Sequence, residues 1–246
     1  MFDLRIHDAV DDAATAAARD AAEVLRSALA DGGSARLVAA TGTSQLAMLR
    51  QLVAEPGIDW KAVELFHLDE YIGVADVHPA SFARYIRDRL VEPTGIVTAH
   101  LIDGTAEPTA ECSRLDELLR GRRVDLLLCG IGENGHLAFN DPPADMTTDA
   151  AYLVVELDDA CRRQQVGEGW FETVAEVPTH AISMSMRQIL RADRIVGVVT
   201  GLRKSAAMTR CFGGEVSVEE PASFLRTHDG ATLFADTAAA TGLTRL

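Results

Sequence analysis

Short apolar runs alternate along this chain with longer segments whose apolar residues recur at helical spacing. Runs of four to six apolar or alternating residues predict strands, and apolar residues three to four apart predict amphipathic helices. The predicted strands are residues 2–6, 36–40, 63–68, 97–101, 124–128, 152–157, 181–184, 195–200 and 232–235. The predicted helices include residues 11–29, 45–53, 78–90, 106–119 and 158–166.

This alternation, without repeats, low-complexity tracts or a Pro/Gly-rich linker, predicts the fold class. We expect one α/β domain over residues 1–246, built on a single doubly wound, mostly parallel sheet with helices on both faces. Residues 2–6 are expected to form an edge strand. Loops that follow strands in such a sheet lie at its carboxyl edge, where ligands bind, so four of them are expected to converge: 41–44, 69–73, 130–141 and 200–204.

Composition narrows the class of partner. The formal net charge of −14 argues against nucleic acid and anionic membranes, but a phosphorylated metabolite needs only a few local donors. The four cysteines are far apart and form no CxxC pair, so neither a disulfide framework nor a zinc site is suggested. No apolar run has the length of a membrane span and the first residues lack a signal-peptide pattern, so we expect a cytoplasmic protein.

The richest loop follows the apolar strand at 124–128 and contains three glycines before His136. Imidazole is the side chain best suited to moving protons at neutral pH, and it needs a partner on its second nitrogen to fix the tautomer. Asn134 and Asp141 are both near enough in sequence to be that partner. The loop therefore suggests an oriented acid–base unit.

The same loop also matches a dinucleotide-binding fingerprint, with glycines at 130, 132 and 135 after a strand. That fingerprint requires a long helix after its third glycine. The sequence Asn140-Asp141-Pro142-Pro143 ends any helix within two turns, which disfavours a nicotinamide site.

Three other loops carry candidate chemistry. The Thr41-Gly42-Thr43-Ser44 turn lies between a strand and a helix, and it either binds an anion or simply caps the helix. Asp69 and Glu70, at the end of another strand, are either an acid–base pair or solvated charges in a turn. Arg203 and Lys204 begin a helix, where cations oppose the helix dipole, so at least one of them is expected to bind an anion.

Several motifs together resemble the glucosamine-6-phosphate deaminase family. The loop GIGENGHLAFNDP resembles that family's G-x-G-x-D-G-H-x-A-F-N-E-P, and the segment LDEYIG followed by HPxS resembles its M-D-E-Y-V-G and H-P-x-S-Y. Residues 41–44 and Lys204 fall where the family has its phosphate-binding loop and lysine. The related 6-phosphogluconolactonases typically continue with Ser-Leu-Phe-Pro after the histidine and carry Asp-Glu-Arg where this chain has Asp69-Glu70-Tyr71, so both differences favour the deaminase branch.

The resemblance implies an activity and a role for each matching residue. Glucosamine 6-phosphate and water would give fructose 6-phosphate and ammonia. His136 would assist opening of the sugar ring, Asp69 would carry a proton between C2 and C1, and Asp141 would orient His136 beside Asn134. The implied substrate and phosphate contacts are Thr41, Gly42, Thr43, Ser44, Glu70, Gly135 and Lys204. Neither a metal nor an organic cofactor is implied, because oriented side chains can move a proton next to a carbonyl group.

The chain departs from the family pattern at two of these positions. Asn134 stands where the family usually has aspartate, and it could accept the imidazole N–H but adds no negative charge. Asp141 is one methylene shorter than the usual glutamate. Relatives acting on galactosamine 6-phosphate also carry asparagine in this loop, which leaves the epimer open. The family's lid arginine finds no clear match; Arg162 and Arg163 are the nearest candidates, before residues 167–171, which are either a lid or a surface loop.

Two other functions stay open at this point. A lactonase would share the fold and the phosphate loop and use His136 as the base for hydrolysis. A non-catalytic sugar-phosphate sensor would bind the ligand without turnover. In each case the expected partner is a small sugar phosphate, and the protein is expected to be a monomer or small homo-oligomer.

Overall fold

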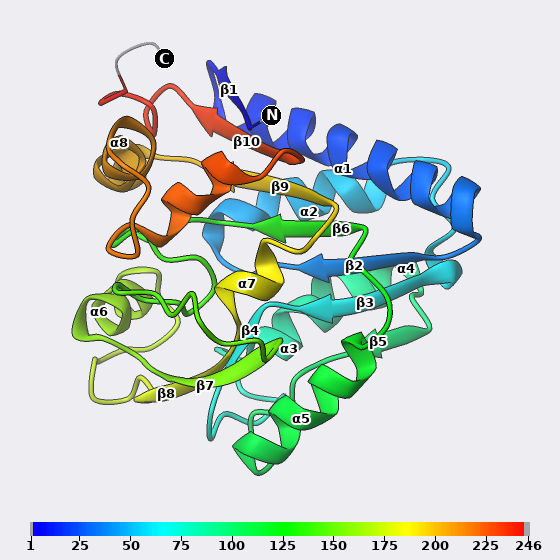
Figure 1. Ribbon diagram of the computed structural model, residues 1–246, viewed down its shortest axis with the longest axis horizontal. Coiled ribbons are helices and arrows are strands. Elements are labelled where there is room, and N and C mark those ends of the chain that lie inside the picture. Colours follow the sequence, from blue (N-terminus) through cyan, green and yellow to red (C-terminus); the bar gives the residue numbers. More distant parts are fainter. Residues whose placement is uncertain (1, 244–246) are drawn as a thin grey trace.

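The computed structural model describes residues 2–243, and its centre is a seven-stranded sheet in which every neighbouring pair of strands is parallel (Figure 1). Every residue of its central strands β2 and β6 is buried, as expected for strands covered on both faces. The predicted α/β class and the edge position of the first strand are confirmed. The strands run in the order β1 (Asp3–His7), β10 (Ala231–Asp236), β9 (Arg194–Val199), β6 (Leu126–Cys129), β2 (Ala35–Ala39), β3 (Val63–His67) and β5 (Thr98–His100).

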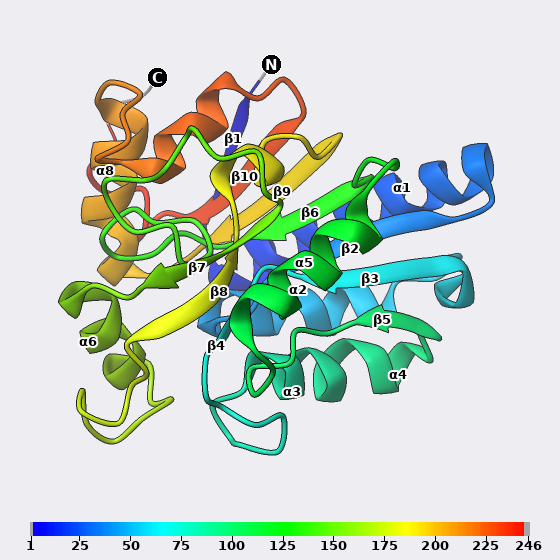
Figure 2. The same ribbon diagram turned by 60° about the horizontal axis from the view of Figure 1, so that its bottom comes forward.

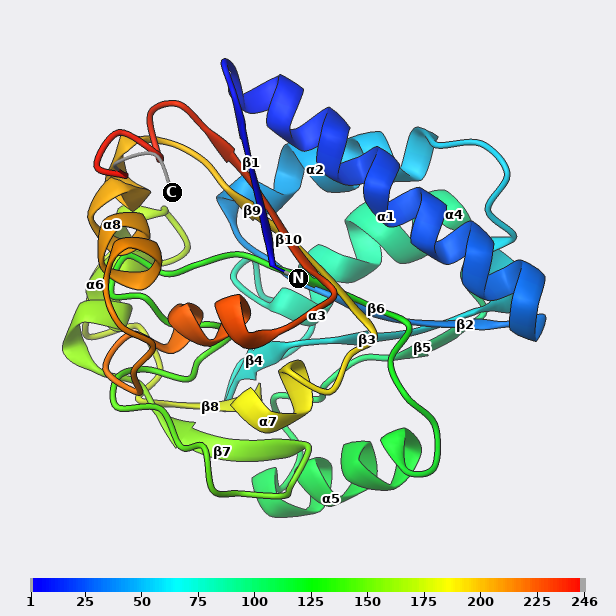
Figure 3. The ribbon, with the colours of Figure 1, turned by 45° about the horizontal axis from the view of Figure 1, so that its top comes forward.

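Helices cover both faces of this sheet (Figures 1 and 3). On one face lie α1 (Val10–Gly32), α2 (Thr43–Ala54) and the continuous helical segment α3 (Phe82–Ile86), η2 (Arg87–Val91) and α4 (Glu92–Thr94). The other face carries α7 (Met186–Ile189) and η4 (Pro221–Thr227). The remaining helical segments are η1 (Trp60–Ala62), α5 (Pro108–Leu119), α6 (Asp159–Gly167), η3 (Leu202–Lys204) and α8 (Ser205–Gly213). Between residues 2 and 243 no helix has the length and apolarity needed to cross a membrane.

The long helix α1 packs on the sheet through a stripe of small residues. Six alanines at positions 13, 14, 17, 18, 21 and 22 are buried together with Leu25. These positions recur every three to four residues and so share one face of the helix. The helix ends at Gly33, which adopts a left-handed conformation (φ +69°) and donates its N–H to the carbonyl of Leu29.

Three strands form a second, smaller antiparallel sheet rather than joining the large one. Its order is β4 (Asp69–Tyr71), β8 (His180–Met184) and β7 (Tyr152–Glu156) (Figure 2). We predicted the last two as members of a single sheet and residues 69–73 as a loop, so the structure differs here. Alternate residues of β7 are exposed, a pattern typical of an antiparallel sheet with one face toward solvent.

The chain passes from one sheet to the other at Leu68. The N–H of Leu68 donates to the carbonyl of Ala39 in the large sheet (3.1 Å), and its carbonyl accepts from the N–H of Met184 in the small sheet (2.7 Å). Hydrogen bonds to both sheets therefore fix the backbone immediately before Asp69.

The order of the strands places a crevice beside β2. The chain proceeds from β2 outward to β3 and β5, and then returns to the other side of β2 to build β6, β9 and β10. Ligands bind at such a reversal, outside the carboxyl ends of the strands. The four predicted loops follow β9, β6, β2 and β3, which are neighbours in the sheet, and this adjacency brings the loops together.

Candidate active site

A single pocket lies over the carboxyl ends of these neighbouring strands. It encloses about 570 Å³ of space, part of which is open solvent at its mouth. The predicted candidates that line it are Thr41, Gly42, Thr43, Ser44, Asp69, His136 and Lys204. Segments separated by up to 160 positions in the sequence thus meet at one place.

One end of the pocket is suited to an anion. Residues 41–44 lead into α2, whose first N–H groups have no partner within the helix, and Gly42 adopts a φ of +105° that favours glycine. Lys204 is only 8% exposed, and its one ion-pair partner among residues 2–243 is Glu168, with Nζ and Oε1 3.9 Å apart. Burial lowers the pKa of Lys204, whereas the Glu168 carboxylate raises it. A buried ammonium without a close acceptor is costly, so an anion between Lys204 and the 41–44 loop would be stabilised.

Asp69 lies in the pocket without any hydrogen bond to its carboxyl group from the described part of the chain. It is 6% exposed. Burial raises its pKa from 3.8 to about 8, with a further contribution from the negative charge of Glu70. An unengaged carboxyl group with such a pKa is well matched to accept and return a proton near neutral pH.

Glu70 and Gly135, which we expected to contact substrate, do not line the pocket. The Glu70 carboxylate points at the start of α3, where it accepts hydrogen bonds from the backbone N–H groups of Phe82 and Ala83 and from the hydroxyl of Ser81. Gly135 (φ +92°) donates to Gly132 and accepts from the backbone of Ala222. Both residues therefore shape the site from outside, Glu70 by capping a helix and Gly135 by turning the loop.

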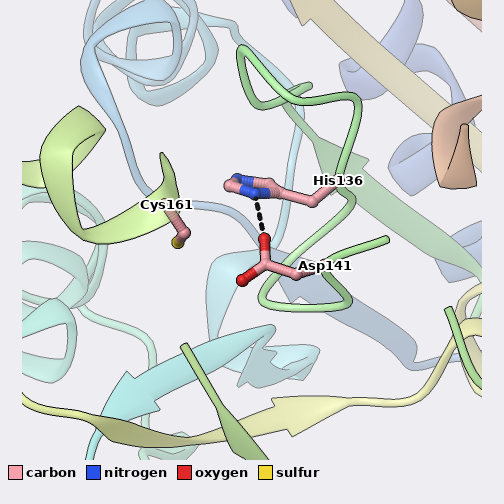
Figure 4. A group of neighbouring side chains, drawn as sticks. All are labelled: His136, Asp141 and Cys161. Carbon is pink, nitrogen blue, oxygen red and sulfur yellow. Dashed lines mark hydrogen bonds and ion pairs between the residues drawn. The ribbon is translucent and has the colours of Figure 1, made fainter. Parts of the chain in front are cut away.

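His136 faces the pocket and is held from behind by Asp141. Its Nδ1 lies 2.8 Å from Oδ1 of Asp141, so the carboxylate accepts the Nδ1 proton and leaves Nε2 free as the proton acceptor (Figure 4). Burial raises the pKa of Asp141, but hydrogen bonds from His136 and Asn134 outweigh this effect and hold the pKa below its ordinary value. The shorter aspartate thus reaches the imidazole despite replacing the family's glutamate.

Asn134 takes a different position from the one we considered. It does not accept the imidazole N–H: its side-chain carbonyl accepts the backbone N–H of His136 (3.1 Å), and its amide donates to Oδ1 of Asp141 (2.9 Å). Asn134 therefore supports Asp141, and the asparagine supplies a donor that an aspartate could not.

The helix α6 and the residues after it supply pocket residues that sequence reasoning did not assign. Gln164, Gln165 and Glu168 line the pocket, and Gln164 donates to Oε1 of Glu168 (2.7 Å). Trp170 donates its indole N–H to the other carboxylate oxygen (3.2 Å). In the sequence, only the glycines that flank Glu168 and the aromatic pair that follows it indicated that this segment could cover a pocket. Arg162 instead donates to backbone carbonyls of Val174 and Val177 and does not line the pocket.

Comparison with known proteins finds sequence relatives that are named as sugar-phosphate enzymes, which fits a pocket suited to an anion. The family model described as glucosamine-6-phosphate isomerases/6-phosphogluconolactonase matches residues 8–234. A glucosamine-6-phosphate deaminase of Exiguobacterium sp. is 40% identical over 202 residues, which cover 82% of this chain and 78% of the relative. The deaminase of Clostridium acetobutylicum is 32% identical over 227 residues, covering 89% of this chain and 92% of the relative.

Solved structures of a deaminase and of a 6-phosphogluconolactonase have a fold similar to that of this chain. The structure of a monomeric glucosamine-6-phosphate deaminase matches with a TM-score of 0.88 at 27% identity, covering 98% of this chain and all of that one. A 6-phosphogluconolactonase from Shewanella baltica matches with a TM-score of 0.79 at 20% identity, covering 96% of this chain and 98% of that one. At the lower identity the likeness shows the fold alone.

Replacing Asn134 by aspartate is expected to destabilise the protein in a pH-dependent manner. The substitution removes the donor to Asp141 and places a second carboxylate about 3 Å from the first, which raises the pKa of one of them. The free energy of unfolding at pH 8 should fall by roughly 1–3 kcal/mol, the usual cost of an unsatisfied buried group, and recover partly at pH 5 as one carboxyl group is protonated. Denaturant unfolding at the two pH values measures this.

The control is Asn134→Ala, which removes the same amide without adding charge. Its loss of stability should be similar at both pH values. Equal stability of Asn134→Asp and the natural protein at pH 8 would show that the Asn134 amide does not support Asp141.

Replacing Glu168 by glutamine is expected to tighten the binding of inorganic phosphate. The Glu168 carboxylate now lies where it would repel an anion bound to Lys204, and two unit charges about 4 Å apart interact by roughly 1–4 kcal/mol near a protein surface. We expect about a tenfold or larger decrease in the dissociation constant by calorimetry, corresponding to at least 1.4 kcal/mol. Glu172→Gln, an exposed charge on the same segment, should bind phosphate as the natural protein does. Unchanged or weaker binding by Glu168→Gln would contradict the assignment.

Proposed function

Because this chain belongs to the family of glucosamine-6-phosphate isomerases and 6-phosphogluconolactonases, we propose that it isomerises and deaminates an amino-sugar phosphate. Glucosamine 6-phosphate and water would give fructose 6-phosphate and ammonia. The observation that carries the proposal is that an unengaged buried carboxyl group, an oriented imidazole and an anion-binding end share one pocket. Sequence likeness to the deaminases reaches 40%, whereas the lactonase likeness above is one of fold.

The phosphate would bind at the end formed by residues 41–44 and Lys204. Backbone N–H groups at the start of α2 and the Lys204 ammonium are donors suited to a dianion. Glu168 would move away from Lys204 when the phosphate arrives, because both anions cannot share the ammonium without repulsion. The far end of the sugar would then lie near Asp69 and His136, which line the same pocket.

Ring opening is the step proposed for His136. The C1–O5 bond breaks while the anomeric hydroxyl loses a proton and the ring oxygen gains one. Nε2 of His136 is free to accept the first proton and deliver the second, because Nδ1 is committed to Asp141. The lowered pKa of Asp141 keeps that carboxylate ionised, which stabilises the imidazolium formed in between.

Isomerisation is the step proposed for Asp69. In the open-chain aldehyde with its amino group protonated, the Asp69 carboxylate would remove the proton from C2 and return it to C1, while a proton of the ammonium group passes to the aldehyde oxygen and makes it a hydroxyl. The double bond then lies between C2 and nitrogen, water adds to C2, and ammonia leaves to give the ketone. The raised pKa of Asp69 makes its carboxylate a stronger base than an exposed one.

We propose that residues 1–246 act as one domain, as a monomer or small homo-oligomer; the monomeric state described for one deaminase of known structure supports the first alternative. A cytoplasmic location stays a prediction. The epimer also stays open between glucosamine and galactosamine 6-phosphate.

A substrate panel tests the proposed reaction. Glucosamine 6-phosphate should release ammonia with formation of fructose 6-phosphate, whereas 6-phosphogluconolactone should not be hydrolysed above its spontaneous rate. Galactosamine 6-phosphate in the same assay identifies the epimer. Lactone hydrolysis without ammonia release would contradict the proposal, and phosphate binding without any turnover would indicate a sensor.

Replacing Asp69 by asparagine should remove most of the activity without loss of the fold. Positioned acid–base groups typically contribute roughly 10²–10⁴-fold, so kcat should fall within that range while phosphate binding is retained. Asparagine removes a carboxyl group that is costly to ionise in its buried position, so the variant should unfold at a higher temperature than the natural protein at pH 8. A kcat within twofold of the natural value would exclude Asp69 as the proton carrier.

A further inference from the structure

The thiol of Cys161 lies beside the His136–Asp141 pair, although the proposed reaction does not use it. Cys161 is in the first turn of α6, and its backbone N–H donates to the side chain of Asp158, which caps that helix. The residue is 1% exposed and does not line the sugar pocket. Figure 4 shows the imidazole, the carboxylate and the thiol arranged around one small space, and their ligand atoms all lie within 4.8 Å of one another.

We propose that His136, Asp141 and Cys161 form an inhibitory binding site for a thiophilic divalent cation such as Zn²⁺. Imidazole nitrogen, carboxylate oxygen and thiolate sulfur are the ligand types that zinc prefers. Tetrahedral coordination at about 2.0–2.3 Å from each atom requires ligands about 3.3–3.8 Å apart. Nδ1 of His136 and Oδ1 of Asp141, now 2.8 Å apart, would separate, and all three ligand atoms already lie within 4.8 Å of one another. A water molecule would complete the coordination.

A second feature, a groove lined by carboxylates, would draw cations toward this site. A groove separate from the sugar pocket reaches Asp141 and is lined by five carboxylates, those of Asp141, Asp145, Glu156, Asp158 and Asp159. Such a concentration of negative charge raises the local concentration of cations. Asp141 and Asp158 both lie beside Cys161, and their charges would stabilise a divalent cation in this space.

Binding of the metal would displace the thiol proton of Cys161 and move the imidazole proton of His136. Bonds form from the metal to Nδ1 of His136, Oδ1 of Asp141 and Sγ of Cys161. The thiol proton is released to solvent, and the imidazole proton moves from Nδ1 to Nε2, so the Nδ1–Asp141 hydrogen bond is lost. With its proton on Nε2, His136 can no longer accept one from the sugar, and this inhibition, though not the binding itself, rests on the proposed function.

The experiment uses the full chain freed of metal with a chelator and titrated with Co²⁺ as a spectroscopic probe. The natural protein and Cys112→Ser, which changes another buried cysteine, should both develop a thiolate-to-cobalt absorption band that Zn²⁺ removes. Cys161→Ser and Cys161→Ala should lack the band. Serine and alanine are both used because a polar and an apolar side chain have different costs at a buried position. Thermal unfolding of each variant shows that it is folded.

Inhibition of ammonia release gives the second readout. Both Cys161 variants should keep the activity of the natural protein without metal, and should need at least tenfold more Zn²⁺ for half-inhibition, since loss of a metal ligand or its support typically costs about 10–100-fold in affinity. Absence of the band in the natural protein, or its persistence in a folded Cys161 variant, would overturn the proposal. Equal inhibition of natural protein and Cys161 variants would do the same. The cobalt band needs no turnover, so it separates failure of this site from failure of the proposed reaction.

Discussion

Burial of the Asp69 carboxyl group is the constraint on which the rest of the site depends. The group lies where the chain leaves the large parallel sheet and enters the small antiparallel one, and its backbone is held there by pairing of β4 with β8. Because its pKa in the folded protein is raised to about 8, far above the unfolded value of 3.8, it lowers stability progressively as the pH rises from about 4 to 8. The fold tolerates this cost because the neighbouring backbone is fixed by both sheets. The small sheet thus has a chemical role, because its strand β4 holds the backbone that places the Asp69 carboxyl group in the pocket.

Two aspartates in this site are driven in opposite directions by their surroundings. No group of residues 2–243 donates a hydrogen bond to the Asp69 carboxyl group, and its pKa is raised. Asp141 accepts from His136, Asn134 and the backbone of Asp158, and its pKa is lowered. Such a separation is what a site needs to hold one carboxyl group as a proton carrier and the other as a permanent charge. Glu168, which also lines the pocket, places a carboxylate 3.9 Å from the Lys204 ammonium, where it would compete with a phosphate.

Sequence reasoning found the features that are local and missed those that depend on tertiary contacts. The strands and the loops after them follow from periodicity. Closeness in sequence left Asn134 and Asp141 both open as the partner of His136, and the family resemblance pointed to Asp141. The separate sheet did not, because β4 is three residues long and carries two charges, which resembles a turn until β8 is placed beside it. The sequence predicted that Glu70 contacts the substrate. Its carboxylate instead accepts hydrogen bonds from Ser81, Phe82 and Ala83 at the start of α3, and these bonds turn it away from the pocket. The donation from Asn134 to Asp141 depends on an amide orientation that no spacing reveals.

Titration of the Asp69 carboxyl carbon by NMR, in protein labelled with ¹³C at its aspartate carboxyl groups, tests the central claim most directly. The Asp69 signal is identified by its absence in Asp69→Asn. The account predicts a midpoint of about 8 in the ligand-free protein. A midpoint near about 4, the value of an exposed aspartate, would mean that its surroundings do not raise the pKa of Asp69, and the stronger base on which the mechanism rests would not exist.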